Sequence, residues 1–320
     1  EPFINYNLEN LIFSNDTIRT TDLIRRKWLN NDFGGLTFSL HHNTNKINLI
    51  IGGATNRYSG QHYGNIIWSE YALNIPYNYE YYKNIATKYD HNLYIKADYS
   101  INKNTNLYAD LQRRNIEYQF TLDNTEQTPQ TVQHEFFNPK IGIYYNLNDL
   151  QSIYASFGIA NKEPNRNDYR ESSVESRPEH ETLNDFECGY KIIGDAINFN
   201  LNIYNMIYKN QLVLTGKIND VGAYTRTNID DSFRKGIEIQ GSVIFTDYLQ
   251  WAGNLTLSKN KITKYTAYVD NWDTWEQEEF EYRNSDLAFS PSIIWSSNFN
   301  IKFHSNLKFD FTSKYVGEQF

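Results

Sequence analysis

Apolar and polar residues alternate along much of this chain with a period of two. The segment from Ile197 to Ile203, INFNLNI, alternates without interruption, and similar segments recur along the sequence. Side chains of a β-strand point to opposite faces in turn, so such a segment has one apolar and one polar face. The pattern predicts an all-β protein whose strands meet apolar surroundings on one side and water on the other.

Twelve strands are expected from this alternation and from the turn residues that separate its segments. They cover residues 32–42, 47–57, 86–101, 105–120, 134–147, 151–160, 183–193, 196–211, 233–246, 249–263, 287–303 and 306–316. Several exceed the roughly 9 to 11 residues that a tilted strand needs to cross the apolar layer of a membrane, so we expect them to project beyond it.

The connections between these strands are of two kinds that alternate strictly. Short connections rich in turn-forming residues fall at 43–46, 102–104, 148–149, 194–195, 246–247 and 304–306. Long polar and aromatic connections fall at 58–85, 122–133, 161–183, 212–232 and 264–286. Tight turns on one rim and large loops on the other are typical of a transmembrane antiparallel up-and-down β-barrel.

The alternation also assigns faces. Apolar positions 93, 95, 97, 99 and 101 oppose polar positions 92, 94, 96, 98 and 100, and the same holds around 237–245 and 307–312. A Lys or Arg on the lipid face costs roughly 2–4 kcal/mol at mid-membrane, so we expect the polar faces to line a wet interior. A soluble sandwich with one solvated face explains the alternation but not the rhythm of the loops.

Composition excludes several other classes. The chain has 320 residues and a mean hydropathy of −0.67, and no apolar run approaches the 18 or so residues of a membrane helix. The net charge of −8 argues against a nucleic-acid partner, which favours a basic surface. Lone Cys188 cannot form an internal disulfide, and no Cys/His spacing suggests zinc.

The sequence contains no local signature of catalysis. It has no nucleophile elbow, phosphate-binding glycine loop or metal-binding His pair, so we predict no catalytic residue, no cofactor and no metal site. A hydrolase site assembled from scattered strand residues is the alternative. The pair His41–His42 falls at a strand end, where solvated imidazoles are expected.

A series of motifs resembles the TonB-dependent outer-membrane receptors, particularly those of the Bacteroidetes type. In order they are DLIRRKWLNNDF (22–33), SIYASFG (152–158), NKEPNRNDY (161–169), RPE (177–179), DFECGYK (185–191), YKNQLVLTG (208–216), NDVGA (219–223), GIE (236–238), FSP (289–291) and YVGEQ (315–319). The resemblance covers nearly the whole chain, and the order of the motifs is more specific than any single one.

The resemblance implies a barrel of about 22 strands with a plug domain inside, located in the cell outer membrane as a multi-pass barrel. Residues 1–320 would then be a partial barrel domain of about 12 strands. The plug domain, its TonB-contacting segment and the remaining strands are expected to lie outside these residues. Terminal Phe320 is interpreted as an interior position of the family pattern.

The resemblance further implies a receptor that binds a scarce nutrient with its large loops and imports it using energy passed on by TonB. A ferric siderophore or another iron complex is the expected cargo, because aromatic side chains give rigid contact area and Arg recognises carboxylates with a forked geometry. Candidate substrate-binding residues are Tyr79, Tyr82, Arg166, Tyr169, Arg170, Arg177, His180, Tyr224, Arg226, Trp272 and Trp275.

Alternatives stay open for these residues and for the function. The aromatic residues could form an interfacial girdle, and the Arg residues could bind lipopolysaccharide phosphates or pair with acids; the EPNR (163–166) and RPE (177–179) motifs could shape their loop. Haem is not favoured, because NKEP (161–164) stands where haem receptors have a Phe-Arg-Ala-Pro box.

The expected partners are TonB, the nutrient, outer-membrane lipid and lipopolysaccharide, and nucleic acid is not among them. The alternative functions are a passive porin and a surface-binding protein without transport. The alternative cargoes are cobalamin, an oligosaccharide and a peptide.

Overall fold

The computed structural model divides into two compact units. Unit 1 comprises Glu1–Phe38, Gly52–Leu93 and Arg114–Glu135, and unit 2 comprises Ser39–Ile51, Tyr94–Arg113 and Phe136–Phe320. The structure describes residues 1–13, 16–71, 75–121, 130–170, 172, 177–218, 224–304 and 306–319. The side chains of Phe13, Arg170 and Tyr224 lie outside this description.

The described residues are mostly strands. The elements are the 3-10 helix η1 (Phe3–Tyr6), β1 (Leu11–Phe13), β2 (Asp16–Ile18), β3 (Leu23–Asn43), β4 (Ile47–Ser69), β5 (Tyr79–Ser100), β6 (Thr105–Phe120), β7 (Gln130–Asn146), β8 (Gln151–Lys162), the helix α1 (Arg166–Arg170), β9 (Glu181–Ile193), β10 (Ile197–Ile218), β11 (Tyr224–Thr246), β12 (Leu249–Asn271), β13 (Glu276–Asp286), β14 (Ile293–His304) and β15 (Leu307–Val316).

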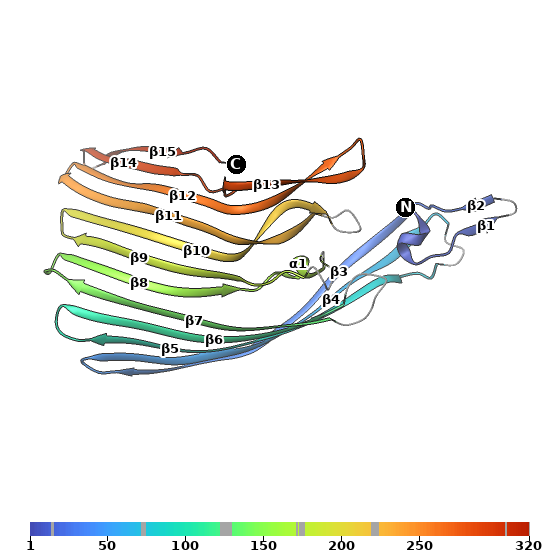
Figure 1. Cartoon of the computed structure of the whole chain (residues 1–320), viewed down its shortest axis with the longest axis horizontal. Helices are drawn as coiled ribbons and strands as arrows, with labels where there is room; N and C mark the ends of the chain where they lie inside the picture. The colour runs from blue at the N-terminus through green and yellow to red at the C-terminus, as the bar shows by residue number, and fades with distance from the viewer. Residues whose placement is uncertain are drawn as a thin grey trace. The chain divides into compact units, whose positions relative to one another are not determined.

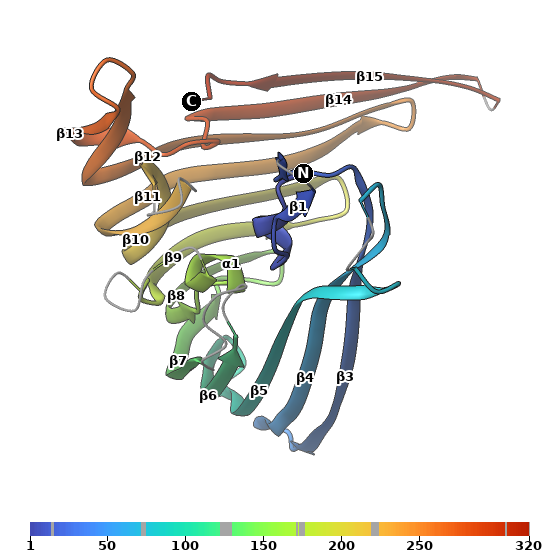
Figure 2. The same cartoon turned by 90° about the vertical axis from the view of Figure 1, so that its right-hand side faces the viewer.

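One sheet contains β3 to β15, and its strands are neighbours in chain order (Figures 1 and 2). The exception is β13, which pairs with β12 beside the main order, so that β14 also follows β12 directly. From β7 to β12 each strand is antiparallel to the next, as are β12 with β14 and β14 with β15. The predicted all-β, up-and-down arrangement is confirmed.

Each of the twelve expected strands overlaps a strand of this sheet, and the short connections fall where they were predicted. The turn predicted at 304–306 includes Ser305, and the loop predicted at 122–133 includes 122–129, all of which lie outside the described residues. Strand β13 was not predicted, because its residues fall in the segment interpreted as the loop 264–286.

The strands run further toward the long-loop side than the alternation predicts. Strand β4 ends at Ser69 where a loop was expected from residue 58. Strand β10 runs to Ile218 and β11 begins at Tyr224, where a loop was expected over 212–232. Beyond the apolar layer both faces of a strand meet water, so the period-two pattern fades while backbone pairing continues. The alternation therefore predicts ends for these strands that fall short of the observed ends.

The strand registers confirm the two predicted faces in unit 2. On the apolar face, Leu201 pairs with Tyr190 and Ile239, and Ile239 in turn pairs with Leu255. On the other face, Asn200 pairs with Lys191. The apolar row continues through Trp295 and Tyr315, and the polar row runs on through Gln240, Asn254, Ser296 and Lys314.

Large apolar side chains of unit 2 are exposed along the strands. Trp295 is 37% exposed and Tyr315 48% exposed in their row, and Phe309 and Phe311 are exposed further along β15. A buried apolar cluster of unit 2, Ile229 with Ile262 and Leu287, lies toward the long-loop ends of its strands. In the part of the chain that is described, no helix is long and apolar enough to cross a membrane.

We predict that Leu201→Arg in the full-length protein impairs membrane assembly, because the substitution puts a charge in the middle of the apolar row at a cost of about 2–4 kcal/mol. Phe199→Arg should behave alike. Asn200→Arg, on the polar face one residue away, should assemble normally. The measurement is the fraction of the protein in outer membranes that shows the heat-modifiable mobility of a folded barrel. Equal damage from Leu201→Arg and Asn200→Arg would refute the assigned faces.

Candidate functional site

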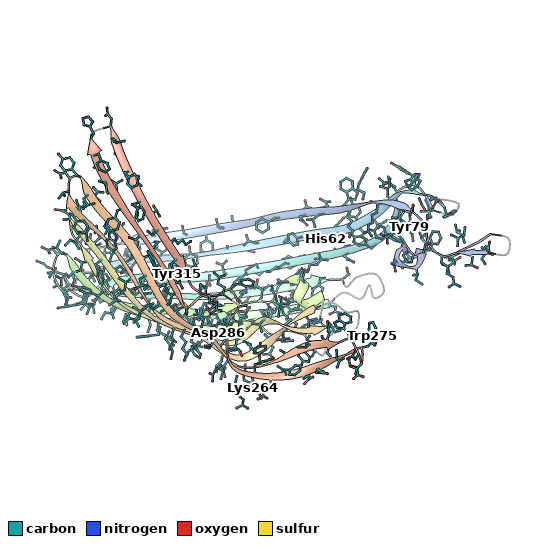
Figure 3. The ribbon with its side chains drawn as sticks, turned by 90° about the horizontal axis from the view of Figure 1, so that it is seen from above. His62, Tyr79, Lys264, Trp275, Asp286 and Tyr315 are labelled. Carbon is teal, nitrogen blue, oxygen red and sulfur yellow. The ribbon has the colours of Figure 1, made fainter. Side chains whose placement is uncertain are left out.

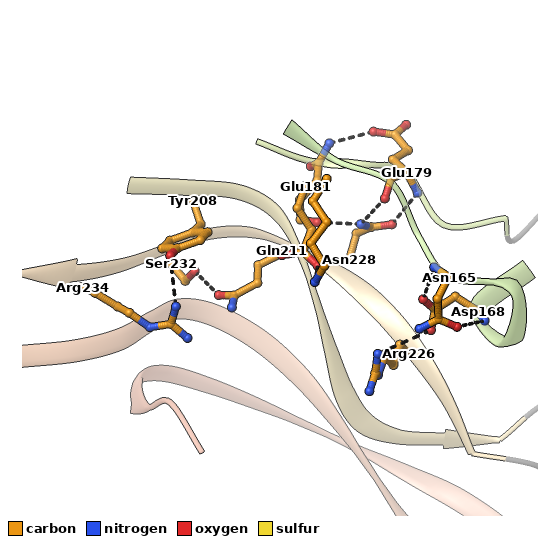
Figure 4. Close-up of polar contacts among 12 residues, drawn as sticks. Asn165, Asp168, Glu179, Glu181, Tyr208, Gln211, Arg226, Asn228, Ser232 and Arg234 are labelled. Carbon is orange, nitrogen blue, oxygen red and sulfur yellow. Dashed lines mark hydrogen bonds and ion pairs between the residues drawn. The ribbon is translucent and has the colours of Figure 1, made fainter. Parts of the chain in front are cut away.

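The long connection between β8 and β9 holds the short helix α1 at the loop-side end of unit 2 (Figure 4). Asn165 begins this helix: its Oδ1 accepts hydrogen bonds from the N–H groups of Asn167 (2.9 Å) and Asp168 (3.1 Å). Asp168 Oδ2 in turn accepts from the Asn165 N–H at 2.8 Å. This reciprocal pair is a capping box, which fixes where the helix starts.

Asp168 also joins α1 to strand β11. Its carboxylate is 6% exposed, and its Oδ1 lies 3.8 Å from Nη1 of Arg226 (Figure 4). A buried carboxylate needs both hydrogen bonds and a counter-charge, and the cap and Arg226 supply them. Arg226 is 45% exposed, so one side of its guanidinium is also open to solvent.

The RPE motif is fastened to β10 and β11 by an amide network (Figure 4). Asn228 accepts from the Glu179 N–H at 2.8 Å and donates to the carbonyl oxygens of Glu179 (3.0 Å) and Asn210 (2.6 Å). Asn210 donates to Glu179 Oε2 at 2.7 Å and has a φ of 54°, a left-handed conformation that Asn tolerates better than most residues. The motif thus has a structural role in shaping its loop.

Beside these contacts, β10 and β11 carry a group of half-buried polar side chains around the buried Ser232. Arg234 Nη1 donates to the Tyr208 hydroxyl at 3.0 Å, and its guanidinium lies 5.0 Å from the centre of that ring. Ser232, 1% exposed, donates to Gln211 Oε1 at 2.5 Å. The Arg234 charge is therefore held against an aromatic ring.

A hollow of about 460 Å³ lies nearer the short-turn end of unit 2. Amide side chains from four strands line it, together with Lys191, Ser242 and Ser296. The amides are Asn198, Asn200, Gln240, Asn254 and Asn298. Amides both donate and accept, so this wall can bind neutral polar groups such as hydroxyls.

The hairpin of β12 and β13 carries a tryptophan pair at its turn, of which Trp275 is labelled in Figure 3. Trp272 and Trp275 are 72% and 81% exposed, and their rings meet edge to face with centroids 5.9 Å apart. Asn271 organises the turn by accepting from the N–H of Asp273 at 2.9 Å. The hairpin is rich in acids: Asp270, Asp273, Glu276, Glu278, Glu279 and Glu281.

Gln277 connects this hairpin to the end of β10. Its Nε2 donates to the Gly216 carbonyl at 2.8 Å and its Oε1 accepts from the Ile218 N–H at 3.1 Å. Gly216 has a φ of +85°, and a Cβ there would collide with the Tyr268 carbonyl oxygen, so only glycine allows this approach.

Tyr79 and Tyr82 belong to unit 1, where they pack around a core of Tyr6, Ile66 and Tyr81. Tyr82 contacts the Tyr81 ring edge to face at 4.9 Å, and the Tyr79 hydroxyl donates to the Asn7 carbonyl at 3.4 Å. Both residues were predicted as loop contacts for substrate, and the contacts described here are with the fold itself.

The remaining candidate residues lie in or beside the α1 connection, on the β12–β13 hairpin, or outside the described side chains. Arg166 and Tyr169 lie on α1 and Arg177 and His180 follow it; Tyr169 is 2% exposed, and the His180 ring packs edge to face on Phe136 at 5.2 Å. Arg226 reaches this segment through Asp168. Trp272 and Trp275 are on the separate hairpin. The candidate side chains of Arg170 and Tyr224 and the NDVGA motif (219–223) lie outside the described residues.

Asp168, Asn210 and Asn228 are among the residues whose structural roles were not predicted. The spacing of Asn165 and Asp168 is a readable capping signal. The bridges made by Asn210 and Asn228 join strands and loops far apart in sequence and have no local signal. Among the described residues, no group of three His, Cys, Asp or Glu side chains could hold a metal ion.

Comparison with known proteins identifies the family. The family model described as TonB dependent receptor-like, beta-barrel, matches residues 3–318, so the chain belongs to this family. Its members are transport receptors of the outer membrane and not enzymes, which confirms the predicted location and the absence of an enzymatic role. Comparison with curated proteins gave no match.

Solved structures share the fold at low sequence identity. The siderophore receptor PiuA from Acinetobacter baumannii superposes with a TM-score of 0.67 at 14% identity, over 91% of this chain and 46% of PiuA. The copper transporter OprC gives 0.66 at 14% identity, over 87% of this chain and 42% of OprC. P. aeruginosa FpvA, in a pyoverdine–iron complex, gives 0.60 at 17% identity, over 92% and 39%. The chain thus spans less than half the length of these structures.

We predict that Asn228→Ala loosens the RPE segment, because the Glu179 backbone loses both of its hydrogen bonds to this side chain. Water can replace part of this loss at the exposed site, so a cost of about 1 kcal/mol is expected, which corresponds to roughly fivefold faster amide exchange. Hydrogen exchange of residues 177–181 measures it. Asn198→Ala, which removes a single 3.4 Å bond to Ser242 elsewhere, is the control. Unchanged exchange in Asn228→Ala would contradict the proposed anchoring.

The stability of β13 should depend on pH through Glu281. Hydrogen bonds from Lys264, first, and from Arg283 lower the pKa of the Glu281 carboxyl below its ordinary value of 4.5. A lowered pKa stabilises the folded hairpin above pH 4.5, and this stabilisation is lost as the pH falls through the lowered pKa. As the pH falls through the lowered pKa of Glu281, amide exchange of residues 276–286, corrected for intrinsic rates, should become faster in the native protein. It should not become faster in the Glu281→Gln variant. The same profile in both proteins would exclude this role.

Proposed function

We propose that the full-length protein is an outer-membrane receptor that binds a scarce nutrient at its loop-side end and imports it through the barrel with energy from TonB. The family match over residues 3–318 carries this proposal. The coupling to TonB runs through the plug domain that the family resemblance implies. On the ordered motifs from DLIRRKWLNNDF to YVGEQ, we also assign the protein to the Bacteroidetes type.

An iron complex, such as a ferric siderophore, is the proposed cargo. Two observations support it. The similar structures include a siderophore receptor and a receptor in complex with a pyoverdine and iron. In addition, Arg166 and Arg177 lie in the connection that carries α1, and Arg226 contacts the same connection through Asp168. Guanidinium groups bind the carboxylates of organic chelators with forked hydrogen bonds.

The acidic hairpin gives this proposal a spatial preference. Trp272 and Trp275 offer aromatic contact area, but the carboxylates around them repel an anionic chelate. An anionic cargo would therefore bind near α1, and the tryptophan pair would contact an uncharged part of it. These roles of the candidate residues are part of the proposal.

An oligosaccharide is the second candidate cargo, because of the 460 Å³ hollow on the polar face. Among the described residues, its lining has five amides and one lysine and includes no carboxylate. A neutral wall of amides suits hydroxyl-rich molecules better than it suits a charged chelate. The membrane partners remain as proposed from the sequence: lipid against the apolar face, and lipopolysaccharide in the outer leaflet.

Deletion of the intact gene should slow growth under iron limitation and reduce uptake of labelled ferric siderophore, with growth under cobalamin or glycan limitation unchanged. A defect confined to glycan limitation would select the oligosaccharide instead. Absence of a defect under any limitation would contradict an importer. Uptake that persists after loss of TonB would identify a passive channel, whereas uptake that stops would exclude one.

A further inference from the structure

Two lysines face each other on the apolar side of unit 2. Lys235 on β11 and Lys259 on β12 are direct cross-strand partners, and both are exposed. Their row continues across the sheet through Asn205 to Phe186 on β9 and Phe157 on β8. Like charges directly opposite each other destabilise a sheet, so this pair calls for an anion.

The pair lies at the loop-side edge of the apolar band. On β11 the apolar-face positions from Ile237 to Phe245 carry no charge, and this length matches the roughly 9 to 11 residues that cross the apolar layer. Lys235 is the next position on the same face toward the long loops. Long loops of such barrels are extracellular, so the two ammonium groups lie at the level of the outer-leaflet headgroups.

Neighbouring acids do not neutralise the pair. Asp286 is taken by Lys261, at 2.6 Å, and Asp231 stands opposite Lys209. Within the described part of the chain, neither Lys235 nor Lys259 forms a salt bridge. The Lys235 ammonium lies 5.2 Å from the Phe233 ring, which is two residues nearer the loops, so this side chain extends toward the headgroups.

An apolar groove begins two strands away. It has a volume of about 590 Å³, and its lining includes the small residues Ala97, Ala109 and Ala155 and the large residues Phe157 and Phe186. Phe186 is in the lysine row, with one strand between it and Lys235, which is a separation of about 10 Å from the strand spacing. A hydrocarbon chain fits such a groove, and its headgroup would reach the lysines.

We propose that this face binds one molecule of lipid A, the phosphorylated glycolipid anchor of the outer leaflet. A phosphate of lipid A would lie between Lys235 and Lys259, and an acyl chain would enter the groove at Phe186. The phosphate relieves the repulsion between the two ammonium groups, and lysine binds phosphate as a compact charge. The proposal uses the outer-membrane location of the family and is independent of the imported cargo.

The test compares lipid A retained by purified full-length receptor, measured by mass spectrometry after reconstitution with lipid A and phosphatidylglycerol. The double variant Lys235→Ala, Lys259→Ala should retain roughly tenfold less lipid A than the native receptor. Lys191→Ala, which removes a lysine from the polar face, should retain the native amount. Heat-modifiable mobility verifies that each variant is folded.

Two further measurements separate the parts of the site. The native receptor should retain lipid A without phosphates only weakly. The amount should equal that of intact lipid A retained by the double variant. Ala155→Phe, which fills the groove, should also lower retention while both lysines remain. Native retention by the double variant would overturn the proposal. So would equal retention of phosphatidylglycerol and lipid A, since that would indicate a general ring of anionic lipid.

Discussion

Backbone hydrogen bonding in an apolar solvent is the constraint on which the structure depends. Hydrocarbon cannot pair with N–H or C=O groups, so a chain that crosses it must satisfy them internally. Here consecutive strands do so by pairing in chain order from β3 to β12 and on to β14 and β15. Side chains are then free of any interior packing requirement on the outer face. This explains why Trp295 and Tyr315 lie exposed along the sheet, while the cluster around Ile262 is buried toward the long-loop ends of the strands.

Beyond the apolar layer the same strands meet water. There, specific polar contacts determine the shape of the connections. The connection between β8 and β9 is held by a capping box at Asn165 and Asp168 and by the bridges that Asn228 makes to Glu179. Each of these contacts contributes little by itself, but together they give this loop a defined shape. Several arginines and aromatic residues of the candidate site are attached to that framework.

The part of the fold that lipid dictates could be predicted from sequence, since lipid imposes the period of two that reveals each strand. The faces around Leu201 and the short turns were found in this way, and the family resemblance added the class of protein. Strand β13 and the long-loop ends of β4 and β10 were not predicted, because these segments meet water on both faces and do not alternate apolar with polar residues. Of the site, the capping spacing at Asn165 and Asp168 was readable, whereas the bridges of Asn228 depend on tertiary contacts. The roles of the candidate residues in binding cargo stay predictions.

Gln277 helps to hold the hairpin that carries Trp272 and Trp275 against β10. Its two hydrogen bonds to β10, at Gly216 and Ile218, have a combined net worth of about 1–3 kcal/mol. A ligand that binds with micromolar affinity releases about 8 kcal/mol. Thermal motion thus rarely breaks both hydrogen bonds, whereas a fraction of the binding free energy of such a ligand is enough to break them.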